Sequence, residues 1–447
     1  MTYKIAIIGS GPSAFYAAQA LFKGHDDLKV DMFEKLPTPY GLLRGGVAPD
    51  HQQMKTVSKA YDKIASHENF RFFGNVEIGK DIDLPTLKKY YNCVILAIGA
   101  ETDRKMNIPG EDLSGSYTAT EFVAWYNGQP NYQNHQFNLN GSTAIIIGQG
   151  NVAVDVTRIL SKPVTELQKT DITQKAIDLL KNSRIKDVYM VGRRGPAQAA
   201  FTELELKELG HIDGVNLKIH DDLNLSEADL QEVELSSKAR KNIKLLKEFK
   251  ESLPFDPNKK TIHLLFFSSP IEVVDDKNQI KKVVFEKNIL VGEAGKQKAQ
   301  SSGETFEIEC DILLRSIGYK GVPFKGLPFD DRKGVIPNDK GQVVEIDGTH
   351  VEDTYVTGWI KRGPSGVIGT NRSDSIETVG TCLATLEKTT IKDATDIVTV
   401  FNEKNIKFLT YEDWKIIDEY EVKAGHELGK PREKVTSIDK IFEILNK

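Results

Sequence analysis

Residues 3–34, YKIAIIGSGPSAFYAAQALFKGHDDLKVDMFE, decide the fold class of this chain. The apolar segment from Lys4 to Gly9 predicts a strand, and the glycine-rich turn after it opens a helix that runs to about Lys23. A second strand is predicted over Lys29–Glu34. Strand, GxGxxA turn, helix and strand in this order form the βαβ unit that binds a dinucleotide, so the sequence predicts an α/β fold built on parallel strands.

Each small residue of the turn has a specific structural role. Gly9 allows the tight turn, Gly11 lets the backbone approach a pyrophosphate, and Ala14 lets the helix pack closely on the strand. The helix N-terminus then faces the phosphates. Glu34 ends the second strand, where a carboxylate can bind ribose hydroxyl groups. A lone GxGxxA motif is weak, and the flanking strand, helix and acid make this one indicative of a dinucleotide site.

The same pattern returns in the middle of the chain. Ser142–Ile147 predicts a strand, GQGNVA at 148–153 repeats the turn, and Asn151–Leu160 predicts a helix. Asp187–Val191 predicts the neighbouring strand. A helix-cap signal at 170–172 predicts one additional helix between them.

The two units differ where the second strand ends. Arg193 and Arg194 stand in the second unit where the first has Glu34. A carboxylate would repel the 2′-phosphate of NADP, whereas guanidinium groups bind it, so the second unit is predicted to prefer NADPH to NADH. The alternative is a solvated pair of surface arginines. A chain with two such units is most simply one that passes a hydride from NADPH to a flavin.

Composition bounds the remaining possibilities. The 447 residues, 39% hydrophobic and 28% charged, indicate a soluble protein of two or three domains without membrane insertion. The net charge of −5 argues against general nucleic-acid binding. Because the apolar strand Ile5–Ile8 follows the first residues directly, no signal or transit peptide is expected and a cytoplasmic location is predicted; the alternative is a mature organellar protein whose presequence has been removed. The sequence leaves the oligomeric state open.

The cysteines exclude one class of acceptor. Cys93, Cys310 and Cys382 are far apart in the chain and form neither a CxxC pair nor a metal-ligand cluster. Disulfide reductases with two dinucleotide units pass electrons to a close cysteine pair. We therefore predict no disulfide substrate, no iron–sulfur cluster in this chain and no metal site.

Weaker patterns complete the prediction. Expected elements are a helix over 54–66, strands over 70–74 and 93–98, helical segments over 227–251, short strands forming a β-rich appendage over 261–312, a helix over 374–387 and a largely helical C-terminus.

Several blocks carry a resemblance to a known family. Residues 37–44 (PTPYGLLR), 47–51 (VAPDH), 148–155, 192–202 and 355–371 resemble the adrenodoxin reductase family of ferredoxin–NADP reductases, and the match spans nearly the whole chain. The resemblance implies a discontinuous FAD-binding domain, 1–102 with 328–447. The NADP-binding domain, 103–327, would be inserted into it.

The resemblance also assigns residues. FAD contacts are implied for Ser13, Glu34, Leu42 and Val76, NADP contacts for Gln149, Gly150, Asn151, Val152, Arg193, Arg194 and Glu205, and isoalloxazine contacts for Trp359, Gly366, Val367 and Ile368. An independent reason supports the last segment, because amides at the start of a helix can stabilise the negative charge that hydride transfer leaves on the flavin.

Two further residues are candidates for the reaction centre. His51 matches a family histidine near the nicotinamide, and it is interpreted as an orienting or electrostatic group rather than an essential base, with a structural role as the alternative. Asp155 could help to close the two domains, or it could be a helix-surface carboxylate.

The predicted activity is hydride transfer from NADPH to N5 of FAD, followed by single-electron transfer to an acidic iron–sulfur ferredoxin. The alternatives are an NADPH-dependent quinone or dye reductase and a flavin-bearing redox sensor without significant turnover. A helix over 237–250 could supply the basic face that a ferredoxin needs. Its stripe of Arg240, Lys244 and Lys247 lies about a quarter turn from an apolar stripe of Ala239, Ile243 and Leu246, and the alternative is an ordinary solvated helix face.

Overall fold

The first parallel sheet is built from both ends of the chain. The computed structural model describes residues 2–391 and 393–447. The seven-stranded sheet has the order β16-β17-β18-β4-β1-β2-β3, parallel from β18 to β3 and antiparallel among β16, β17 and β18. Its strands are β1 Tyr3–Ile8, β2 Leu28–Glu34, β3 Phe70–Gly74, β4 Cys93–Leu96, β16 Asn338–Asp339, β17 Gln342–Val344 and β18 His350–Val356.

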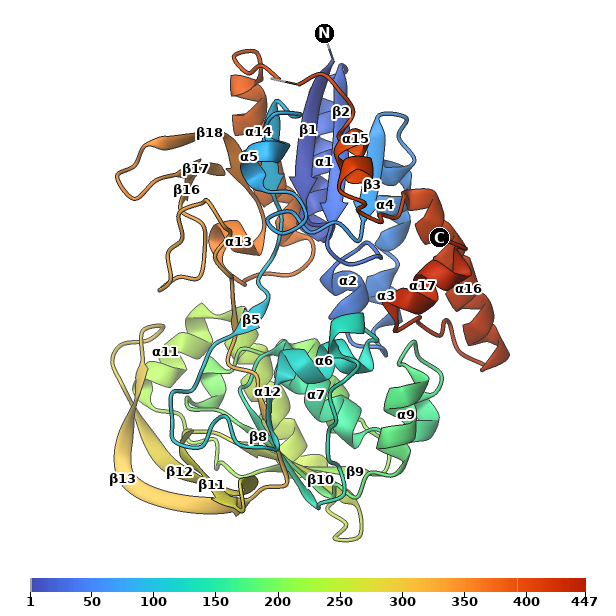
Figure 1. The fold of residues 1–447 in the computed structure, drawn as a ribbon. Helices are drawn as coiled ribbons and strands as arrows, with labels where there is room; N and C mark the ends of the chain where they lie inside the picture. The colour runs from blue at the N-terminus through green and yellow to red at the C-terminus, as the bar shows by residue number, and fades with distance from the viewer. Residues whose placement is uncertain (1, 392) are drawn as a thin grey trace.

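The second sheet comes from the middle of the chain. It is parallel, with the order β6-β14-β7-β8-β10-β9. Its strands are β6 Ser116–Thr118, β7 Thr143–Ile147, β8 Asp187–Val191, β9 Val215–Ile219, β10 Lys260–Leu265 and β14 Ile312–Arg315. Between the sheets, β5 Thr102–Asp103 and β15 Tyr319–Lys320 pair antiparallel, so the two crossings of the chain run side by side (Figure 1).

A third, antiparallel sheet corrects the expectation of short strands over 261–312. The first of those strands, β10, belongs to the second parallel sheet. The others are long and form a three-stranded meander of β11 Ser268–Asp276, β12 Gln279–Val291 and β13 Lys298–Glu309. The meander covers a face of the second sheet, because Val283 and Phe285 pack with Ile145 and Ile147 of β7. The alternate residues Ala144 and Ile146 pack on the opposite, helical side.

Helices cover the remaining faces. The helix predicted over 54–66 is two helices, because the chain turns at Thr56–Val57 between α3 and α4, and the helix predicted from 374 begins at Thr370. The additional helix after 170–172 is present as α9, capped by Thr173. The helices are α1 Pro12–Gly24, α2 Leu42–Gly45, α3 Gln52–Lys55, α4 Ser58–Ala65, α5 Leu84–Leu87, α6 Ala119–Tyr126, α7 Asn151–Ser161, α8 Val164–Leu167, α9 Gln174–Lys181, α10 Glu203–Gly210, α11 Glu227–Leu235, α12 Ser237–Ser252, α13 Trp359–Arg362, α14 Thr370–Leu386, α15 Ile397–Glu403, α16 Tyr411–Glu427 and α17 Ile438–Ile444, with 3-10 turns at Pro130–Tyr132 and Pro196–Gln198.

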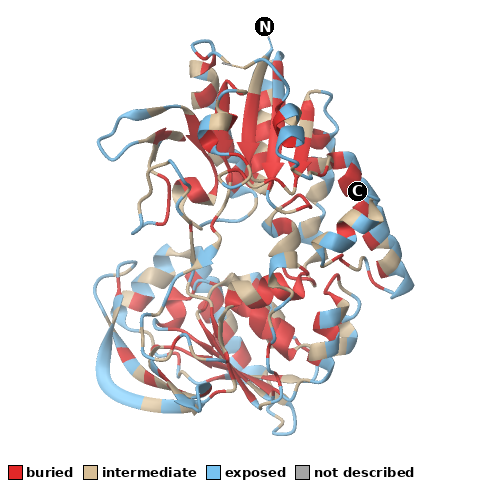
Figure 2. Cartoon of the chain, viewed as in Figure 1, coloured by how far each residue is buried: buried red, intermediate tan, exposed pale blue. Residues whose placement is uncertain are grey.

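Each half of the molecule has its own buried core, which appears as red strands and inner helix faces in both halves of Figure 2. In the first sheet, Ile5 and Ile7 pack with α1 on one side, and Ala6 and Ile8 pack on the other. Within the described residues, no helix is long and apolar enough to span a bilayer.

Candidate functional site: two glycine loops and an interface of charges

The first glycine loop leaves an open space beside its backbone. Gly9 has φ +100°, and a Cβ there would lie 2.5 Å from the carbonyl oxygen of Ala97 after β4, so no larger residue fits. At Gly11, the N-cap of α1, a Cβ would meet nothing within 4 Å. Ala14 is fully buried against the sheet. This loop fits a pyrophosphate, because the free space lies at a helix N-terminus at the carboxyl edge of a parallel sheet.

Glu34 lies beside this loop at the carboxyl end of β2. Its Oε2 accepts hydrogen bonds from the backbone N–H (3.1 Å) and hydroxyl (2.6 Å) of Ser10. Burial raises the pKa of Glu34, although the Leu36 amide and the Ser10 hydroxyl favour the charged form. Val76 is buried and its amide donates to the Glu34 carbonyl at 2.9 Å, whereas Leu42 on α2 is 38% exposed.

The C-terminal glycine segment reaches the first loop across more than 340 positions of sequence. A Cβ at Gly358, where φ is +75°, would lie 2.6 Å from Ser13 Oγ, and Ser375 Oγ donates to the Ser13 carbonyl at 2.9 Å. Trp359 opens α13 directly after Gly358. Gly366 and Val367 are exposed, and Ile368 is half-buried ahead of α14. The segment predicted to face the isoalloxazine is therefore brought to the edge of the sheet that carries the first loop.

The second loop repeats the geometry of the first. Gly148 has φ +131°, and a Cβ there would lie 2.0 Å from the carbonyl oxygen of Ser316 after β14; at Gly150 a Cβ would again meet nothing within 4 Å. Gln149 Nε2 donates to the Leu265 carbonyl at 3.0 Å. Asn151 and Val152 form the first turn of α7, and Asn151 Oδ1 accepts from the Thr202 amide. A dinucleotide pyrophosphate fits this space as well.

Arg193 and Arg194 lie just past the carboxyl end of β8. Both are exposed, and neither forms an ion pair with the residues that the structure describes. Arg194 makes a long contact of 3.4 Å from Nη2 to the Gln198 carbonyl. Two adjacent guanidinium groups without carboxylate partners leave a local excess of positive charge that suits a phosphate.

The two halves of the molecule meet at a buried cluster of charges. His51 Nε2 lies 2.9 Å from Glu208 Oε2 on α10. His51 Nδ1 lies 3.9 Å from both Asp155 Oδ1 and Glu205 Oε1. The structure thus brings together the predicted residues His51, Asp155 and Glu205 across the boundary between the two sheets. Asp155 is not a helix-surface carboxylate, since burial raises its pKa and its side chain is 13% exposed.

Arg158 holds this cluster together. Its guanidinium is fully buried and contacts four carboxylates: Asp50, Asp155 (2.6 Å), Glu205 (3.0 Å) and Glu208 (3.3 Å). Arg158 and Glu208 were not predicted from the sequence. The signal that could have found them is the i,i+3 spacing of Asp155 with Arg158 and of Glu205 with Glu208, which places each pair of charges on one face of its helix.

The cluster shifts the titration of its members. Burial lowers the pKa of His51, but the hydrogen bond to Glu208 and the charges of Asp155 and Glu205 outweigh burial, so the net shift is upward. Burial and the Asp155 charge raise the pKa of Glu205 to about 7. The bond from His51 lowers the pKa of Glu208. Ligand atoms of His51, Glu205 and Glu208 lie within 4.8 Å of one another, but Arg158 already compensates these carboxylates, so we assign no metal here.

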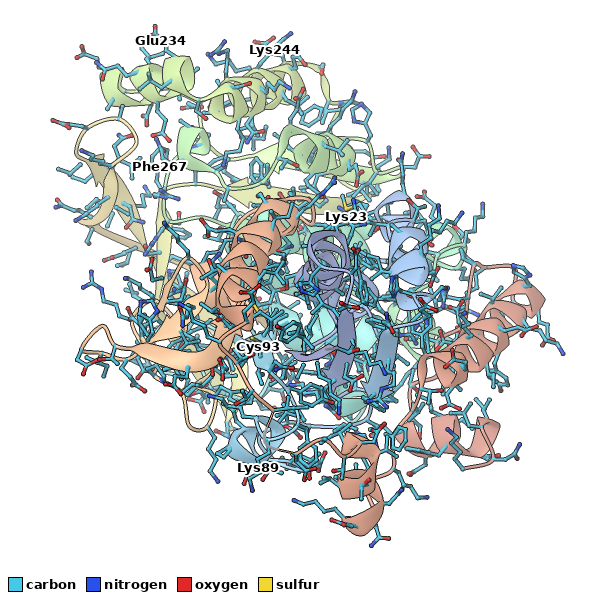
Figure 3. The ribbon with its side chains drawn as sticks, turned by 90° about the horizontal axis from the view of Figure 1, so that it is seen from above. Lys23, Lys89, Cys93, Glu234, Lys244 and Phe267 are labelled. Carbon is cyan, nitrogen blue, oxygen red and sulfur yellow. The ribbon has the colours of Figure 1, made fainter. Side chains whose placement is uncertain are left out.

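Two of the cysteines are neighbours in space although they are distant in the chain. Cys93 and Cys382 are both fully buried in the same core cluster, and the neighbouring Cys382 thiol together with burial raises the pKa of Cys93. Cys93 is the first residue of β4 and lies in the interior of the molecule (Figure 3). It is at the end of the strand opposite to the glycine loops. Buried thiols at that end are poorly placed and poorly ionised for thiol exchange.

Comparison with known proteins identifies the family. The sequence profile of pyridine nucleotide-disulphide oxidoreductases matches residues 3–194. NADPH-ferredoxin reductase FprA of Mycobacterium tuberculosis is 43% identical over 99% of each chain, and mitochondrial NADPH:adrenodoxin oxidoreductase of Arabidopsis thaliana is 42% identical over 97% of this chain and 93% of its own. This chain belongs to the adrenodoxin reductase/FprA family of NADPH-ferredoxin reductases.

The solved structures agree with this assignment. Mycobacterium tuberculosis FprA in complex with NADPH superimposes with a TM-score of 0.93 at 41% identity, covering 100% of both chains. The predicted family and the predicted α/β fold are confirmed.

Proposed function

We propose that this family member is an FAD-dependent NADPH:ferredoxin reductase. One observation carries the proposal: a single chain holds two glycine loops with free space beside them, one next to the carboxylate of Glu34 and one next to the exposed guanidinium groups of Arg193 and Arg194. The first arrangement suits the ribose of FAD and the second suits the 2′-phosphate of NADPH. When bound, FAD accepts a hydride and passes electrons on singly.

The proposed roles follow the geometry. The FAD-binding domain comprises 1–102 and 328–447, and the NADP-binding domain comprises 103–327. FAD is held by Gly9, Gly11, Ser13, Ala14, Glu34, Leu42 and Val76, with Trp359, Gly366, Val367 and Ile368 facing the isoalloxazine. NADPH is held by Gln149, Gly150, Asn151, Val152, Arg193 and Arg194.

The charge cluster serves the nicotinamide end of the site. His51 and Asp155 position the two halves against each other rather than abstract a proton, because hydride transfer requires alignment above all. Glu205 lies beside them, and Arg158 compensates the charge of the carboxylates on α7 and α10, so the proposed role of these residues is to position the two halves.

The electron acceptor is proposed to be an acidic iron–sulfur ferredoxin in the cytoplasm. The exposed stripe Arg240, Lys244 and Lys247 on α12 supports this partner, because a protein with a net charge of −5 needs a local basic face to attract an acidic one. Lys244 lies on the outer face of α12 in Figure 3. The buried positions of Cys93 and Cys382 argue against a disulfide substrate.

The decisive experiment is a pair of assays on the purified flavoprotein. NADPH should bleach its visible absorbance under anaerobic conditions, and reduction of cytochrome c should depend on added ferredoxin. Reduction of ferricyanide or quinones with no response to any of a panel of ferredoxins would identify a dye or quinone reductase instead. Absorbance that NADPH leaves unchanged would reject both enzymes and favour a redox sensor.

A further inference from the structure

The backbone that carries Arg193 and Arg194 is held by the neighbouring strands, which matters here because of the function proposed above for these two residues. Residues 192–194 lie alongside the segment that joins β10 to β11. The Gly192 amide donates to the Leu265 carbonyl at 2.9 Å and the Ser268 amide to the Gly192 carbonyl at 3.0 Å. Three backbone bonds in all fix this short stretch, the third running from the Phe267 amide to the Arg194 carbonyl at 3.1 Å.

Phe267 adopts a backbone conformation that non-glycine residues rarely adopt. Its φ is +51°, in the left-handed region, and its ring lies so close to Gly195 that a Cβ there would be 2.6 Å from Phe267 Cζ. Such a conformation persists only where the surroundings determine it. Here the surroundings are the loop of residues 192–195, called the arginine loop, on one side and β12 on the other. The backbone N–H of Asn288 on β12 donates to the Phe267 carbonyl at 2.7 Å.

Asn288 adds a side-chain contact to this arrangement. It lies on β12 at the point where the register with β13 shifts, and it is 8% exposed. Its Nδ2 donates to the Arg193 carbonyl at 2.9 Å and to Ser269 Oγ at 2.8 Å. One buried amide therefore connects the meander directly to the backbone of the first arginine.

The side chains of the two arginines are exposed and make few contacts, whereas their backbone is fixed. Both side chains are exposed, and neither guanidinium group forms an ion pair within the described part of the chain. Apart from the long bond of Arg194 to the Gln198 carbonyl, the position of the backbone therefore determines where these side chains lie before a ligand binds. When the backbone of a long side chain is fixed, less conformational entropy is lost as the side chain binds a ligand. A shift of the Arg193 carbonyl would move both guanidinium groups relative to the bound phosphate.

We propose that Asn288 is a positioning residue for coenzyme selectivity. Through its bond to the Arg193 carbonyl it holds the arginine loop in the conformation that receives the 2′-phosphate of NADPH. The meander then has a function in the site besides covering the second sheet.

The test compares the Asn288→Ala and Asn288→Asp holoenzymes with the wild type. Neither variant can donate to the Arg193 carbonyl, and aspartate keeps the size of the side chain in case alanine impairs folding. Binding of 2′,5′-ADP and kcat/KM with NADPH should weaken about 3- to 10-fold, as expected for one lost hydrogen bond. Turnover with NADH should change less than about twofold, since NADH lacks the 2′-phosphate.

Ser269→Ala is the matched control, because it removes the other acceptor of the same amide and leaves the Arg193 contact in place. It should keep the NADPH-to-NADH ratio of the wild type. Equal losses with both coenzymes in the Asn288 variants, or an unchanged ratio in both, would overturn the proposal.

The Arg193→Ala/Arg194→Ala variant distinguishes a failure of the role proposed for Asn288 from a failure of the NADPH site proposed at the two arginines. If it loses selectivity while both Asn288 variants retain it, the role of Asn288 is wrong and the proposed function stands. If it retains full selectivity for NADPH, the 2′-phosphate site lies elsewhere and the role of Asn288 is overturned with it.

Discussion

The guanidinium of Arg158 and the carboxylate of Asp50 form a bidentate ion pair between the two halves of the molecule. Nε lies 2.7 Å from Oδ2 and Nη2 lies 3.0 Å from Oδ1. Asp50 immediately precedes His51 in the half with the first sheet, and Arg158 lies on α7 after the second glycine loop. Hydride transfer requires the reacting atoms to be aligned within about 3–3.5 Å. We therefore expect this ion pair to help hold the two halves in the alignment that hydride transfer requires.

Removing Arg158 should be strongly destabilising. In Arg158→Met, Asp50, Asp155 and Glu205 would lose their main buried cation, and breaking a buried pair on one side costs about 3–5 kcal/mol. Urea denaturation would measure the loss of unfolding free energy. The control is Lys287→Met, whose partner Glu304 is 68% exposed and whose pair should contribute at most about 1 kcal/mol. A loss below about 1 kcal/mol in Arg158→Met would contradict the role of the cluster in joining the two halves.

The pair of His51 and Glu208 should give stability a specific pH dependence. The folded protein raises the pKa of His51. Its contribution to stability is therefore fully present below the unfolded pKa of about 6.5 and is lost as pH rises through the folded pKa. Glu208 stays ionised over this range because its pKa is lowered.

Glu208→Gln tests this dependence. The difference in unfolding free energy between wild type and variant should be larger at pH 6 than at pH 9. A difference that is equal at the two pH values would show that the His51 proton does not contribute. Asp418→Asn on α16 is the control, because it removes a carboxylate that is paired with Arg432 rather than with a histidine.

The backbone of this fold could be predicted from the sequence to a large extent. The predicted strand over Asp187–Val191 is observed with the same bounds, and both glycine turns stand where the motif placed them. These elements are encoded locally, by apolar runs and by glycines that the turn requires. The meander was predicted only as short strands, because the length of an antiparallel strand depends on partners that the local pattern does not reveal.

The charge cluster was predicted only in part, for a physical reason. His51 and Asp155 were named singly, but Arg158 and Glu208 were not. An arginine on a helix is usually solvated, and only the approach of Asp50 from the other half of the molecule makes Arg158 a fully buried cation. The contact of Cys93 with Cys382 was missed for the same reason, since β4 and α14 are distant in sequence.

Substitutions at Gly11 and Gly150 should affect the binding of FAD and of NADPH separately. A Cβ at Gly11 or Gly150 would meet no protein atom within 4 Å and neither residue has a positive φ, so alanine fits the protein but intrudes on a pyrophosphate. Gly11→Ala should lower FAD content from the expected value of about one per chain, for a single site. Gly150→Ala should keep FAD and raise KM for NADPH. FAD released by acid and steady-state kinetics measure the two effects, and full FAD content in Gly11→Ala would contradict the first assignment.

The paired arginines should determine which nicotinamide coenzyme is used. Removing both in Arg193→Ala/Arg194→Ala deletes charged contacts to the 2′-phosphate, at a cost of about 2–4 kcal/mol. Preference for NADPH over NADH should fall about 30- to 1,000-fold, mainly through KM. Equal losses with NADPH and NADH would mean that the change harmed the fold or the alignment of the hydride instead.

The basic stripe on α12 should govern the encounter with ferredoxin. The apolar stripe of this helix is buried, as predicted, so Arg240, Lys244 and Lys247 face outward. Arg240→Glu with Lys244→Glu should slow electron transfer to an acidic ferredoxin, mainly through the association rate and more strongly at low ionic strength. Ferricyanide reduction with NADPH should persist, because the glycine loops and the charge cluster are unchanged.

The control must change the net charge equally at another place. Lys415→Glu with Lys423→Glu does so on α16, which lies next to α17 and the C-terminus of the chain (Figure 1). Stopped-flow measurement of ferredoxin reduction at two salt concentrations separates a local effect from that of net charge alone. If the α12 and α16 variants slow the reaction equally, only the net charge matters. If the α12 variant reduces ferredoxin at the wild-type rate at low salt, this helix is not the docking surface.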